Sequence, residues 1–507
     1  MKANSNKFLP ILPLLVLAVA VVTLALWWTS RTGEGLKLRI PGTDSAPGGE
    51  SGGTNPALAG KLIGGVGQPP DLPGNWPQFR GPNRDGISTN AAKYYRDWKT
   101  SPPRELWSLD VGEGYAGVAV HSGRVYLLDY DRDAKQSALR CLSLADGKEI
   151  WRFSYPLTIK RNHGMTRTVP TVTDKFVVAL DSKCNVLCLD AATGELRWTI
   201  SLVREFGATI PDWYAGQCPL VDGDKVIVAP GGKDALLLAV DLATSKSQWQ
   251  TPNPRGWKMT HSSIMPMDFA GRRLYAYCAS RGVVGVDAGD GALLWETSDW
   301  KISIATVPSP LPLSDGKIFL TGGYNAGSLM LQLVASRTDG PTHPQPLQGG
   351  ELRKSPAAQF PSLEGSGVGS DSKSASTASF SCRQVFKLPP EVFGATQHTP
   401  ILKAGYLYGV RADGRFVCLG LGGQVVWTSG PGETFGLGSF LLGGGLIFAL
   451  NDNGKLSLIE ATPARFSLLG QAQILKGRES WAPMALAGDR LVARDLTHLV
   501  CLDVGGK

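Results

Sequence analysis

A pattern that ends in tryptophan recurs along the chain and constrains its fold more than any other feature. The matching segments include "LRCLSLADGKEIW", "VLCLDAATGELRW" and "VVGVDAGDGALLW", and their last residues are Trp151, Trp198, Trp249, Trp295 and Trp427. The first four tryptophans follow one another at intervals of 47, 51 and 46 residues. A fixed period of this length indicates a repeat architecture, in which each unit buries its apolar face against its neighbours.

A second marker counts the repeats independently. Each unit opens with a short apolar segment that follows small or polar residues, and the chain has eight of these: "YAGVAV", "RTVPTV", "GQCPLV", "HSSIMPM", "PSPLPL", "QHTPIL", "LGSFLL" and "WAPMAL". Each is followed by a glycine-containing turn and another apolar run, which is typical of a β-hairpin. Units of four short strands with this period are blades of a β-propeller. The sequence therefore predicts an all-β, eight-bladed β-propeller with four-stranded antiparallel blades.

The two ends of the repeat region predict how the ring closes. The last unit, "HLVCLDVGGK", contains a third strand but no fourth strand. A segment that resembles a fourth strand, "RELWSLDV" around Trp107, precedes the first unit. We expect this segment to complete the last blade, because the ring then has no open sheet edge between its first and last units.

Cysteines raise the question of a redox or metal site, since Cys184 and Cys188 lie four residues apart. Four of the eight cysteines occupy the same position in the third strand of different repeats, namely Cys141, Cys188, Cys418 and Cys501. Other repeats carry Ala239 and Gly285 at that position. A position that alternates among small residues is typical of a buried core site, so we predict a structural role. A Cys184–Cys188 pair is not expected.

The N-terminal part of the chain predicts a membrane anchor and a linker. Residues 8–28 contain no charge over 21 residues, which is enough for a transmembrane helix. The domains predicted are an anchor or signal at 1–30, a flexible linker at 31–73 and the propeller at 74–507, with a low-complexity insertion at about 336–381. The predicted location is a bacterial inner membrane, spanned once, with the propeller on the periplasmic side. A cleaved signal peptide is the alternative for residues 8–28.

Charge and histidine content narrow the choice of partners. The net charge is +8, but lysines and arginines are scattered singly, without a basic run. This distribution indicates a solvated surface, and no nucleic acid partner is predicted. The six histidines include no triplet at metal-ligand spacing, so no metal is predicted either.

The repeat "L-x-C-L-D-A-x-T-G-x-x-x-W" resembles the quinoprotein-type, or PQQ-like, propeller repeat. The stretch "NWPQFRGPNRDGIS" at 75–88 resembles the start of a bacterial, membrane-anchored subgroup of such proteins. The resemblance implies an eight-bladed ring and allows two functions. Quinoprotein dehydrogenases of this superfamily bind PQQ and Ca²⁺ and typically have adjacent cysteines, and this sequence has no such pair. A noncatalytic branch includes the outer-membrane assembly propeller, which binds its partner through loops on one face.

A ligand site in this fold is expected where the innermost strands begin, because their preceding loops converge on the central funnel. An arginine, two histidines and several aromatic residues could hold a planar anion by ion pairing and stacking. The candidate ligand-binding residues are Tyr115, Arg167, Trp213, Tyr214, Lys258, His261, Gln397, His398 and Trp481, with Glu113 and Gln217 nearby in the sequence. No catalytic residue is assigned.

These observations favour a membrane-tethered propeller that binds or scaffolds a protein partner on the export side, rather than an enzyme. Trp213, Tyr214 and Trp481 are candidate contacts for that partner, since aromatic residues dominate binding energy at interfaces. A PQQ-dependent oxidoreductase and a propeller that binds carbohydrate or cell wall are the alternatives. No cofactor is predicted, although PQQ is compatible with the funnel residues.

Overall fold

The computed structural model describes residues 12–29, 54–337 and 378–506. The chain divides into two units, residues 1–45 and residues 46–507. The first contains helix α1 (Leu12–Thr29). Within the described residues no helix combines the length and apolarity that a membrane span needs, and the transmembrane helix predicted at 8–28 is not confirmed. Most of the predicted insertion at 336–381 and residues 31–53 of the predicted linker lie outside the described residues.

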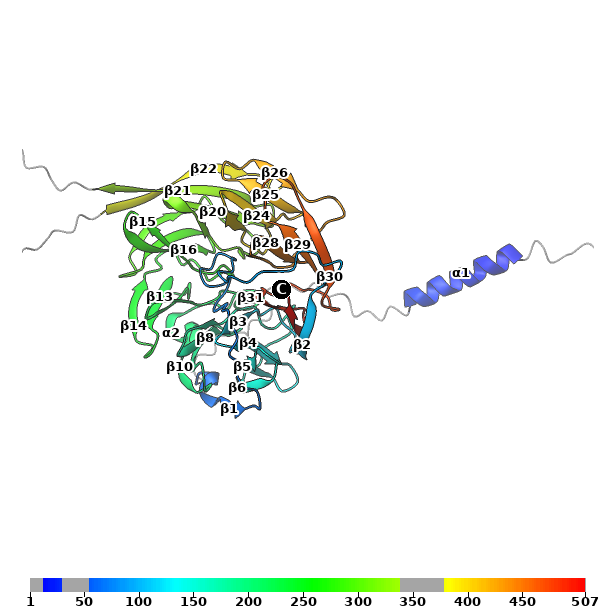
Figure 1. Cartoon of the computed structure of the whole chain (residues 1–507), viewed down its shortest axis with the longest axis horizontal. Helices are drawn as coiled ribbons and strands as arrows, with labels where there is room; N and C mark the ends of the chain where they lie inside the picture. The colour runs from blue at the N-terminus through cyan, green and yellow to red at the C-terminus, as the bar shows by residue number, and fades with distance from the viewer. Residues whose placement is uncertain (1–11, 30–53, 338–377, 507) are drawn as a thin grey trace, which may run out of the picture. The chain divides into compact units, whose positions relative to one another are not determined.

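The second unit contains eight antiparallel sheets, which are the blades of the predicted propeller (Figure 1). Blade 1 contains β1 (Lys61–Gly64), β3 (Val118–His121), β4 (Arg124–Asp131), β5 (Gln136–Ser143) and β6 (Glu149–Pro156). Blade 2 contains β7 (Thr171–Val172), β8 (Phe176–Leu180), β9 (Asn185–Asp190) and β10 (Leu196–Ser201). Blade 3 contains β11 (Leu220–Asp222), β12 (Lys225–Val228), β13 (Leu237–Asp241) and β14 (Ser247–Thr251). Blade 4 contains β15 (Met265–Phe269), β16 (Arg272–Ala279), β17 (Gly282–Asp287) and β18 (Leu293–Thr297).

The other four blades follow the same plan. Blade 5 contains β19 (Leu311–Pro312), β20 (Lys317–Gly322), β21 (Gly327–Arg337) and β22 (Ala378–Leu388). Blade 6 contains β23 (Ile401–Lys403), β24 (Tyr406–Val410), β25 (Phe416–Gly420) and β26 (Val425–Thr428). Blade 7 contains β27 (Phe440–Gly443), β28 (Leu446–Leu450), β29 (Lys455–Glu460) and β30 (Leu468–Gln473), and blade 8 contains β31 (Ala485–Ala487), β32 (Arg490–Arg494), β33 (His498–Asp503) and β2 (Arg104–Asp110). Three helices are short: η1 (Pro56–Ala59) precedes β1, whereas α2 (Leu202–Phe206) and η2 (Ser314–Gly316) lie between strands.

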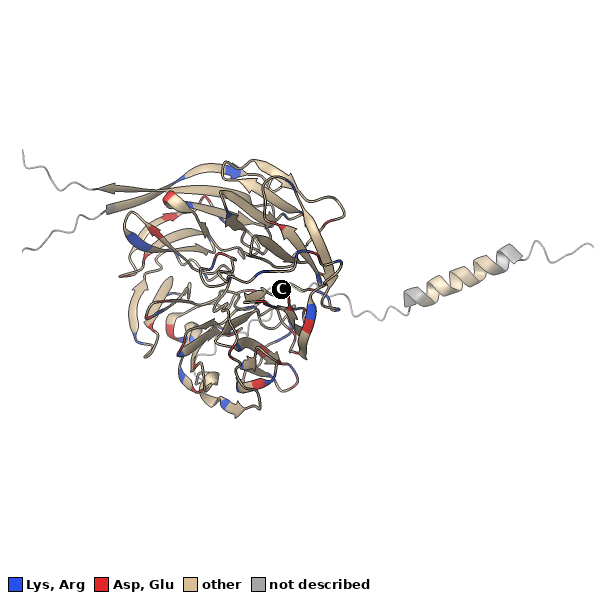
Figure 2. Cartoon of the chain, in the orientation of Figure 1, with Lys and Arg blue, Asp and Glu red and all other residues tan. Residues whose placement is uncertain are grey.

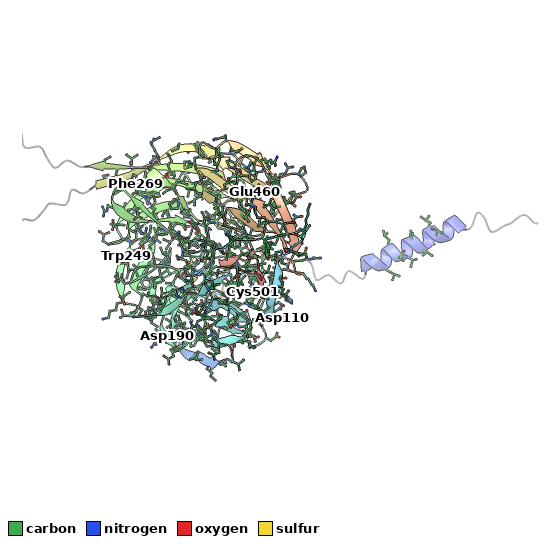
Figure 3. All side chains as sticks on the ribbon, viewed as in Figure 1. Asp110, Asp190, Trp249, Phe269, Glu460 and Cys501 are labelled. Carbon is green, nitrogen blue, oxygen red and sulfur yellow. The ribbon has the colours of Figure 1, made fainter. Side chains whose placement is uncertain are left out.

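The recurring tryptophan and the small residue of the third strand are cross-strand partners. Trp198 pairs with Cys188, and at the equivalent place in blade 4 Trp295 pairs with Gly285. A Cβ atom on Gly285 would lie 1.8 Å from Trp295 Nε1, so the indole ring needs a small partner there. The indole N–H of Trp198 donates to the carbonyl of Leu242, which belongs to the next blade, at 2.9 Å. The repeat therefore encodes the contact that joins one blade to the next, where side chains fill the space between sheets (Figure 3).

All eight cysteines are free, and seven of them are buried. Burial raises the pKa of the Cys188 thiol to about 12, which keeps it protonated and unreactive. Cys184 lies just before β9, and its thiol contacts Met259 rather than Cys188, with a sulfur–sulfur distance of 3.8 Å. The prediction that the recurring cysteines fill core positions is confirmed.

Strand β2 closes the ring as predicted. It pairs antiparallel with β33, and Trp107 faces Cys501 in the register that the other blades use. The indole N–H of Trp107 donates to the carbonyl of Leu144 in blade 1 at 3.0 Å. Blade 8 is therefore joined both to the start of the repeat region and to the blade that follows it in the ring.

Part of the predicted linker is instead built into the propeller. Residues 61–64 form β1, a fifth strand that pairs with β6 at the outer edge of blade 1. Ala57 is fully buried beside it, and the side chain of Asn55 donates to Thr199 Oγ1 of blade 2 at 3.0 Å. The linker prediction is wrong for these residues, because main-chain pairing with β6 can order a segment that has few large apolar side chains.

Residues 75–88 form a segment on the propeller axis, which we call the plug (Figure 1, blue). The plug exchanges main-chain hydrogen bonds with three innermost strands, through Val120, Val172 and Leu442. It includes Arg80 and Arg84, which are both buried. The plug is therefore hydrogen-bonded to the innermost strands of blades 1, 2 and 7.

Charged side chains of both signs are interspersed over the propeller (Figure 2). Many of them form exposed ion pairs, such as Arg197 with Asp190 and Arg273 with Asp268. The described surface therefore agrees with the predicted mixed distribution of charge.

Candidate functional site

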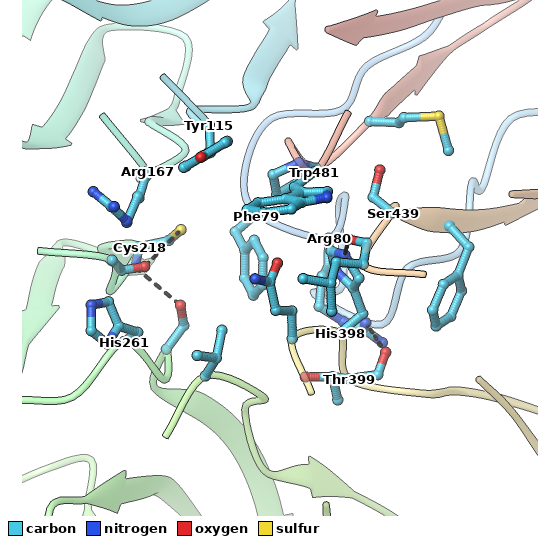
Figure 4. A pocket seen from close by; sticks show the side chains of 18 of the residues that line it. Phe79, Arg80, Tyr115, Arg167, Cys218, His261, His398, Thr399, Ser439 and Trp481 are labelled. Carbon is cyan, nitrogen blue, oxygen red and sulfur yellow. Dashed lines mark hydrogen bonds between the residues drawn. The ribbon is translucent and has the colours of Figure 1, made fainter. Parts of the chain in front are cut away.

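The loops that precede the innermost strands surround a central cavity of about 330 Å³ (Figure 4). Its lining is rich in aromatic rings and contains arginines, histidines and hydroxyl groups, but none of the described residues that line it is an aspartate or a glutamate. The side chains that line the cavity include Trp76, Phe79, Arg80, Tyr115, Arg167, Trp213, Cys218, His261, Ser263, Tyr324, Gln397, His398, Thr399, Ser439, Phe440 and Trp481.

Most of the ligand-binding candidates predicted from the sequence lie together in this cavity. Its lining includes Tyr115, Arg167, Trp213, His261, Gln397, His398 and Trp481. The structure thus brings together residues from loops that are far apart in the sequence. That they bind a ligand remains a prediction.

Two candidates lie elsewhere. The hydroxyl of Tyr214 exchanges hydrogen bonds with the backbone of Lys160, accepting from its N–H at 2.9 Å and donating to its carbonyl at 2.7 Å. Lys258 is exposed, and its backbone N–H donates to Ser280 Oγ at 2.8 Å. Gln217 is also absent from the lining and accepts from the N–H of Ala229 at 2.8 Å. Glu113 forms an ion pair with Arg161.

The cavity also contains side chains that the repeat pattern does not indicate. Phe79 and Arg80 come from the plug, which precedes the first repeat, and Tyr324 comes from the turn between β20 and β21. The plug motif "WPQFRGPNRDG" is a usable signal, since its two arginines and its aromatic residues do not fit any strand of the repeat. We interpret this motif in the sequence as a latch, and the structure places it on the axis.

Arg167 is one of two arginines in the cavity lining, together with Arg80. Its guanidinium donates to the carbonyl groups of Gly164 at 2.9 Å and Asn162 at 3.1 Å, and it lies 5.5 Å from the centre of the Tyr115 ring. No carboxylate of the described residues forms an ion pair with it. Burial lowers the pKa of Arg167 to about 10, so the group keeps its positive charge at neutral pH.

His261 lies beside Arg167, as Figure 4 shows, and its Nε2 has no hydrogen-bond partner among the described residues. Burial, together with the nearby charge of Arg167, lowers the pKa of His261 to about 4. Hydrogen bonds to the backbone of Tyr214 and Asp212 act in the opposite direction. The imidazole is therefore neutral at pH 7.

An aromatic pair forms another part of the wall. Tyr115 and Trp481 stack with their ring centres 5.1 Å apart and an interplanar angle of 27°. The Tyr115 hydroxyl donates to Glu479 at 2.5 Å, and the Trp481 indole N–H donates to Asp452 at 2.8 Å. These two hydrogen bonds fix the positions of the rings. Tyr115 and Trp481 line the cavity, whereas Glu479 and Asp452 lie outside its lining.

Hydrogen bonds from backbone N–H groups to serine and threonine side chains connect the loops around the cavity. The backbone N–H of Cys218 donates to Ser263 Oγ at 3.0 Å, that of Ser263 to Ser309 Oγ at 3.0 Å, and that of Ser309 to Thr399 Oγ1 at 2.8 Å. Each bond joins one blade to the next. Because the donors and acceptors are paired between blades, the wall is preorganised for binding and does not have to be ordered by a ligand.

The plug forms part of the cavity wall, through Trp76, Phe79 and Arg80. Arg80 donates to the carbonyl groups of Thr399 at 2.5 Å and Pro400 at 2.8 Å, at the start of blade 6. Arg84 donates to the carbonyl of Pro219 at 3.1 Å, at the start of blade 3. Two buried guanidinium groups thus connect separate blades across the axis.

We expect the stability of the propeller to fall as pH drops from about 6.5 towards 4. The pKa of His398, like that of His261, is lowered to about 4 by burial, and its Nε2 donates to the carbonyl of Leu437 at 2.7 Å. Between these pH values the unfolded chain takes up protons that the folded chain does not, so folding is disfavoured by about 1–2 kcal/mol per histidine at about pH 4.5. Urea unfolding at both ends of this range measures the loss. It should shrink in His261→Gln and His398→Gln, and equal pH dependence in these variants would contradict the assignment.

The closed ring of eight antiparallel sheets defines the chain as an eight-bladed β-propeller. Residues 134–339 match the family model for outer membrane protein assembly factor BamB. No curated protein matches the sequence.

Solved structures share the fold at low sequence identity. BamB from Moraxella catarrhalis is 13% identical, with a TM-score of 0.50, and the match covers 79% of this chain and 99% of that one. A europium-containing methanol dehydrogenase is 13% identical, with a TM-score of 0.49 and coverage of 84% and 91%. The repeats, the eight-bladed ring and the family match make this chain a PQQ-like β-propeller.

Proposed function

We propose that the central cavity binds a small planar ligand that carries a carboxylate. The observation that carries this proposal is Arg167, a half-buried guanidinium in the cavity wall that forms no ion pair with the described residues. A half-buried charge without a counter-ion is unfavourable, and a carboxylate is the group that its planar donors fit best. The ligand supplies that partner.

The surrounding groups define the rest of the ligand. The free Nε2 of His261 adds a second polar contact beside Arg167. The stacked rings of Tyr115 and Trp481 offer a flat apolar surface, which favours a planar and preferably aromatic group. A cavity of about 330 Å³ falls within the range of small-molecule sites.

PQQ, which the resemblance to quinoproteins implies, fits this cavity only in part. It is planar and carries carboxylates, so Arg167 and the aromatic pair are suitable partners for it. Ca²⁺ prefers oxygen ligands, and carboxylates above all, whereas no aspartate or glutamate lines the cavity. The residues present therefore fit an organic anion but not the Ca²⁺ site of a quinoprotein dehydrogenase, and we derive no redox step.

Arg167→Gln is expected to weaken binding of PQQ by about 10–100-fold, because a charge-assisted hydrogen-bonding group contributes about 1.5–3 kcal/mol. Titration calorimetry with PQQ, together with quenching of tryptophan fluorescence, measures the affinity. A benzenetricarboxylate is a second planar anion that tests whether the cavity recognises the class of ligand rather than PQQ alone.

Arg161→Gln is the matched control, since Arg161 is a partly exposed arginine that pairs with Glu113 outside the cavity. It should leave the affinity unchanged. Failure of both planar anions to bind the unmodified protein would refute the proposed function. Equal affinity in Arg167→Gln would show that the anion binds elsewhere.

A second function, protein binding on the export side of a membrane, is supported by the match to the outer membrane protein assembly factor family. The candidate contacts are Trp213 and Trp481, which line the cavity, and Tyr214. The apolar run at 8–28 supports a tether to the inner membrane. Cell fractionation tests the tether, and copurification from solubilised membranes, with and without Trp213→Ala, tests the partner. Recovery of the full-length protein in the soluble fraction would contradict the tether.

A further inference from the structure

A surface groove of about 710 Å³ lies between the loops of blades 4 and 5. One side is the segment 299–303, which follows β18, and the other is formed by residues 387–390, at the end of β22. Ser280 and the turn at 324–326 complete it. Neither the repeat pattern nor the proposed function accounts for this groove.

The groove and the central cavity have one lining residue in common. Tyr324 belongs to both, and the segment that lines the groove at 299–303 continues to Ala305 and Val307 in the cavity wall. Large apolar side chains are exposed at this junction, because Tyr324 is 42% and Ile304 is 57% exposed. Tyr324 therefore lies in both linings, and the segment 299–307 leads from the groove to the cavity wall.

The groove carries a net positive charge. Its lining contains Lys301 and Lys387 but only one acidic residue, Asp299. Neither lysine forms an ion pair with any described residue. Lys258, one of the candidates predicted from the sequence, is next to the groove, since its backbone bonds to Ser280. Unpaired lysines beside exposed apolar side chains and two prolines favour an extended ligand that is acidic and partly apolar.

We propose that the groove and the cavity form one continuous site for an extended acidic peptide, with a carboxylate of the peptide at Arg167 and its chain running over Tyr324 between Lys301 and Lys387. This inference rests on the proposed function, because it uses the same anion-binding end. It adds a second class of ligand for that end, a segment of polypeptide. The carboxylate is that of an acidic side chain or of the peptide's C-terminus.

The test compares a peptide with a ligand too short to reach the groove. The peptide has about six residues, rich in glutamate, since an extended chain advances about 3.3 Å per residue. It is used with a free and with an amidated C-terminus, which distinguishes the two sources of carboxylate. PQQ is the short ligand. Fluorescence anisotropy of the labelled peptide gives its affinity, and competition by PQQ shows whether the two ligands share the cavity.

Lys301→Gln combined with Lys387→Gln is expected to weaken peptide binding by about fivefold and to leave PQQ binding unchanged, because exposed charge pairs contribute modestly. Lys246→Gln combined with Lys455→Gln is the matched control, as both lysines are exposed on other blades. Arg167→Gln should weaken both ligands. PQQ should displace the peptide.

The two failures can be told apart. If PQQ binds but the peptide does not, or if the groove variant binds the peptide as tightly as the control, the continuous site is wrong while the cavity proposal stands. If the groove variant weakens the peptide but PQQ does not displace it, the groove is a separate site and the proposed continuity is refuted. If neither PQQ nor the peptide binds, both proposals fail.

Discussion

Replacing Trp198 with alanine is expected to lower the free energy of unfolding by about 3–5 kcal/mol, the usual cost of removing a large buried aromatic side chain. The indole packs between blades 2 and 3 and donates to the carbonyl of Leu242. The substitution therefore leaves a cavity between two blades and removes the shorter of the two hydrogen bonds to that carbonyl, the other coming from the Cys188 thiol. Urea unfolding followed by circular dichroism measures the change.

Phenylalanine substitutions separate packing from hydrogen bonding. Trp198→Phe removes a hydrogen bond, whereas Trp295→Phe does not, because Trp295 Nε1 has no partner among the described residues. Trp198→Phe should cost about 1 kcal/mol more than Trp295→Phe. Equal costs would show that the bond to the next blade does not contribute to stability.

Trp76→Ala is expected to lower the free energy of unfolding by about 3–5 kcal/mol and to loosen the plug. Trp76 is buried, its backbone pairs with Val120 of blade 1, and its ring packs against Gly81 within the plug. Hydrogen exchange measures the loosening directly. The amide of Ser88, which donates to the carbonyl of Leu442, should exchange faster in this variant.

The outer strands provide the internal reference for that experiment. The amide of Leu202, just after β10, is far from the plug in the sequence and donates to the carbonyl of Cys184, so its exchange should change only through global unfolding. Trp76→Phe should keep most of the protection of Ser88. If Ser88 stays fully protected in Trp76→Ala, Trp76 does not hold the plug.

The blades could be predicted because each repeat needs a small residue opposite the tryptophan of its fourth strand. The pairing of Trp198 with Cys188 recurs as that of Trp107 with Cys501, so one pattern predicts both the blade count and the closing strand. Strand β1 could not be predicted in this way. It is held by main-chain pairing with β6, which leaves little trace in side-chain identity.

The candidate site could be predicted in position but not in detail. Arg167, His261 and Trp481 precede innermost strands, and the geometry of a propeller directs those loops to the axis. The direction of a single side chain depends on its local contacts. Tyr214 precedes an innermost strand too, yet its hydroxyl binds the backbone of Lys160. Phe79 and Arg80 belong to no repeat, so only the fold shows that they reach the cavity.

The closing blade has a consequence for how the protein is made. Because Trp107 pairs with Cys501, β2 is synthesised about 390 residues before its partner β33. At about 5–20 residues per second, a ribosome needs roughly 20–80 s to supply that partner. During this interval seven blades can assemble while β2 waits unpaired. Its charged residues, Arg104, Glu105 and Asp110, are of the kind that discourages an unpaired strand from joining another chain.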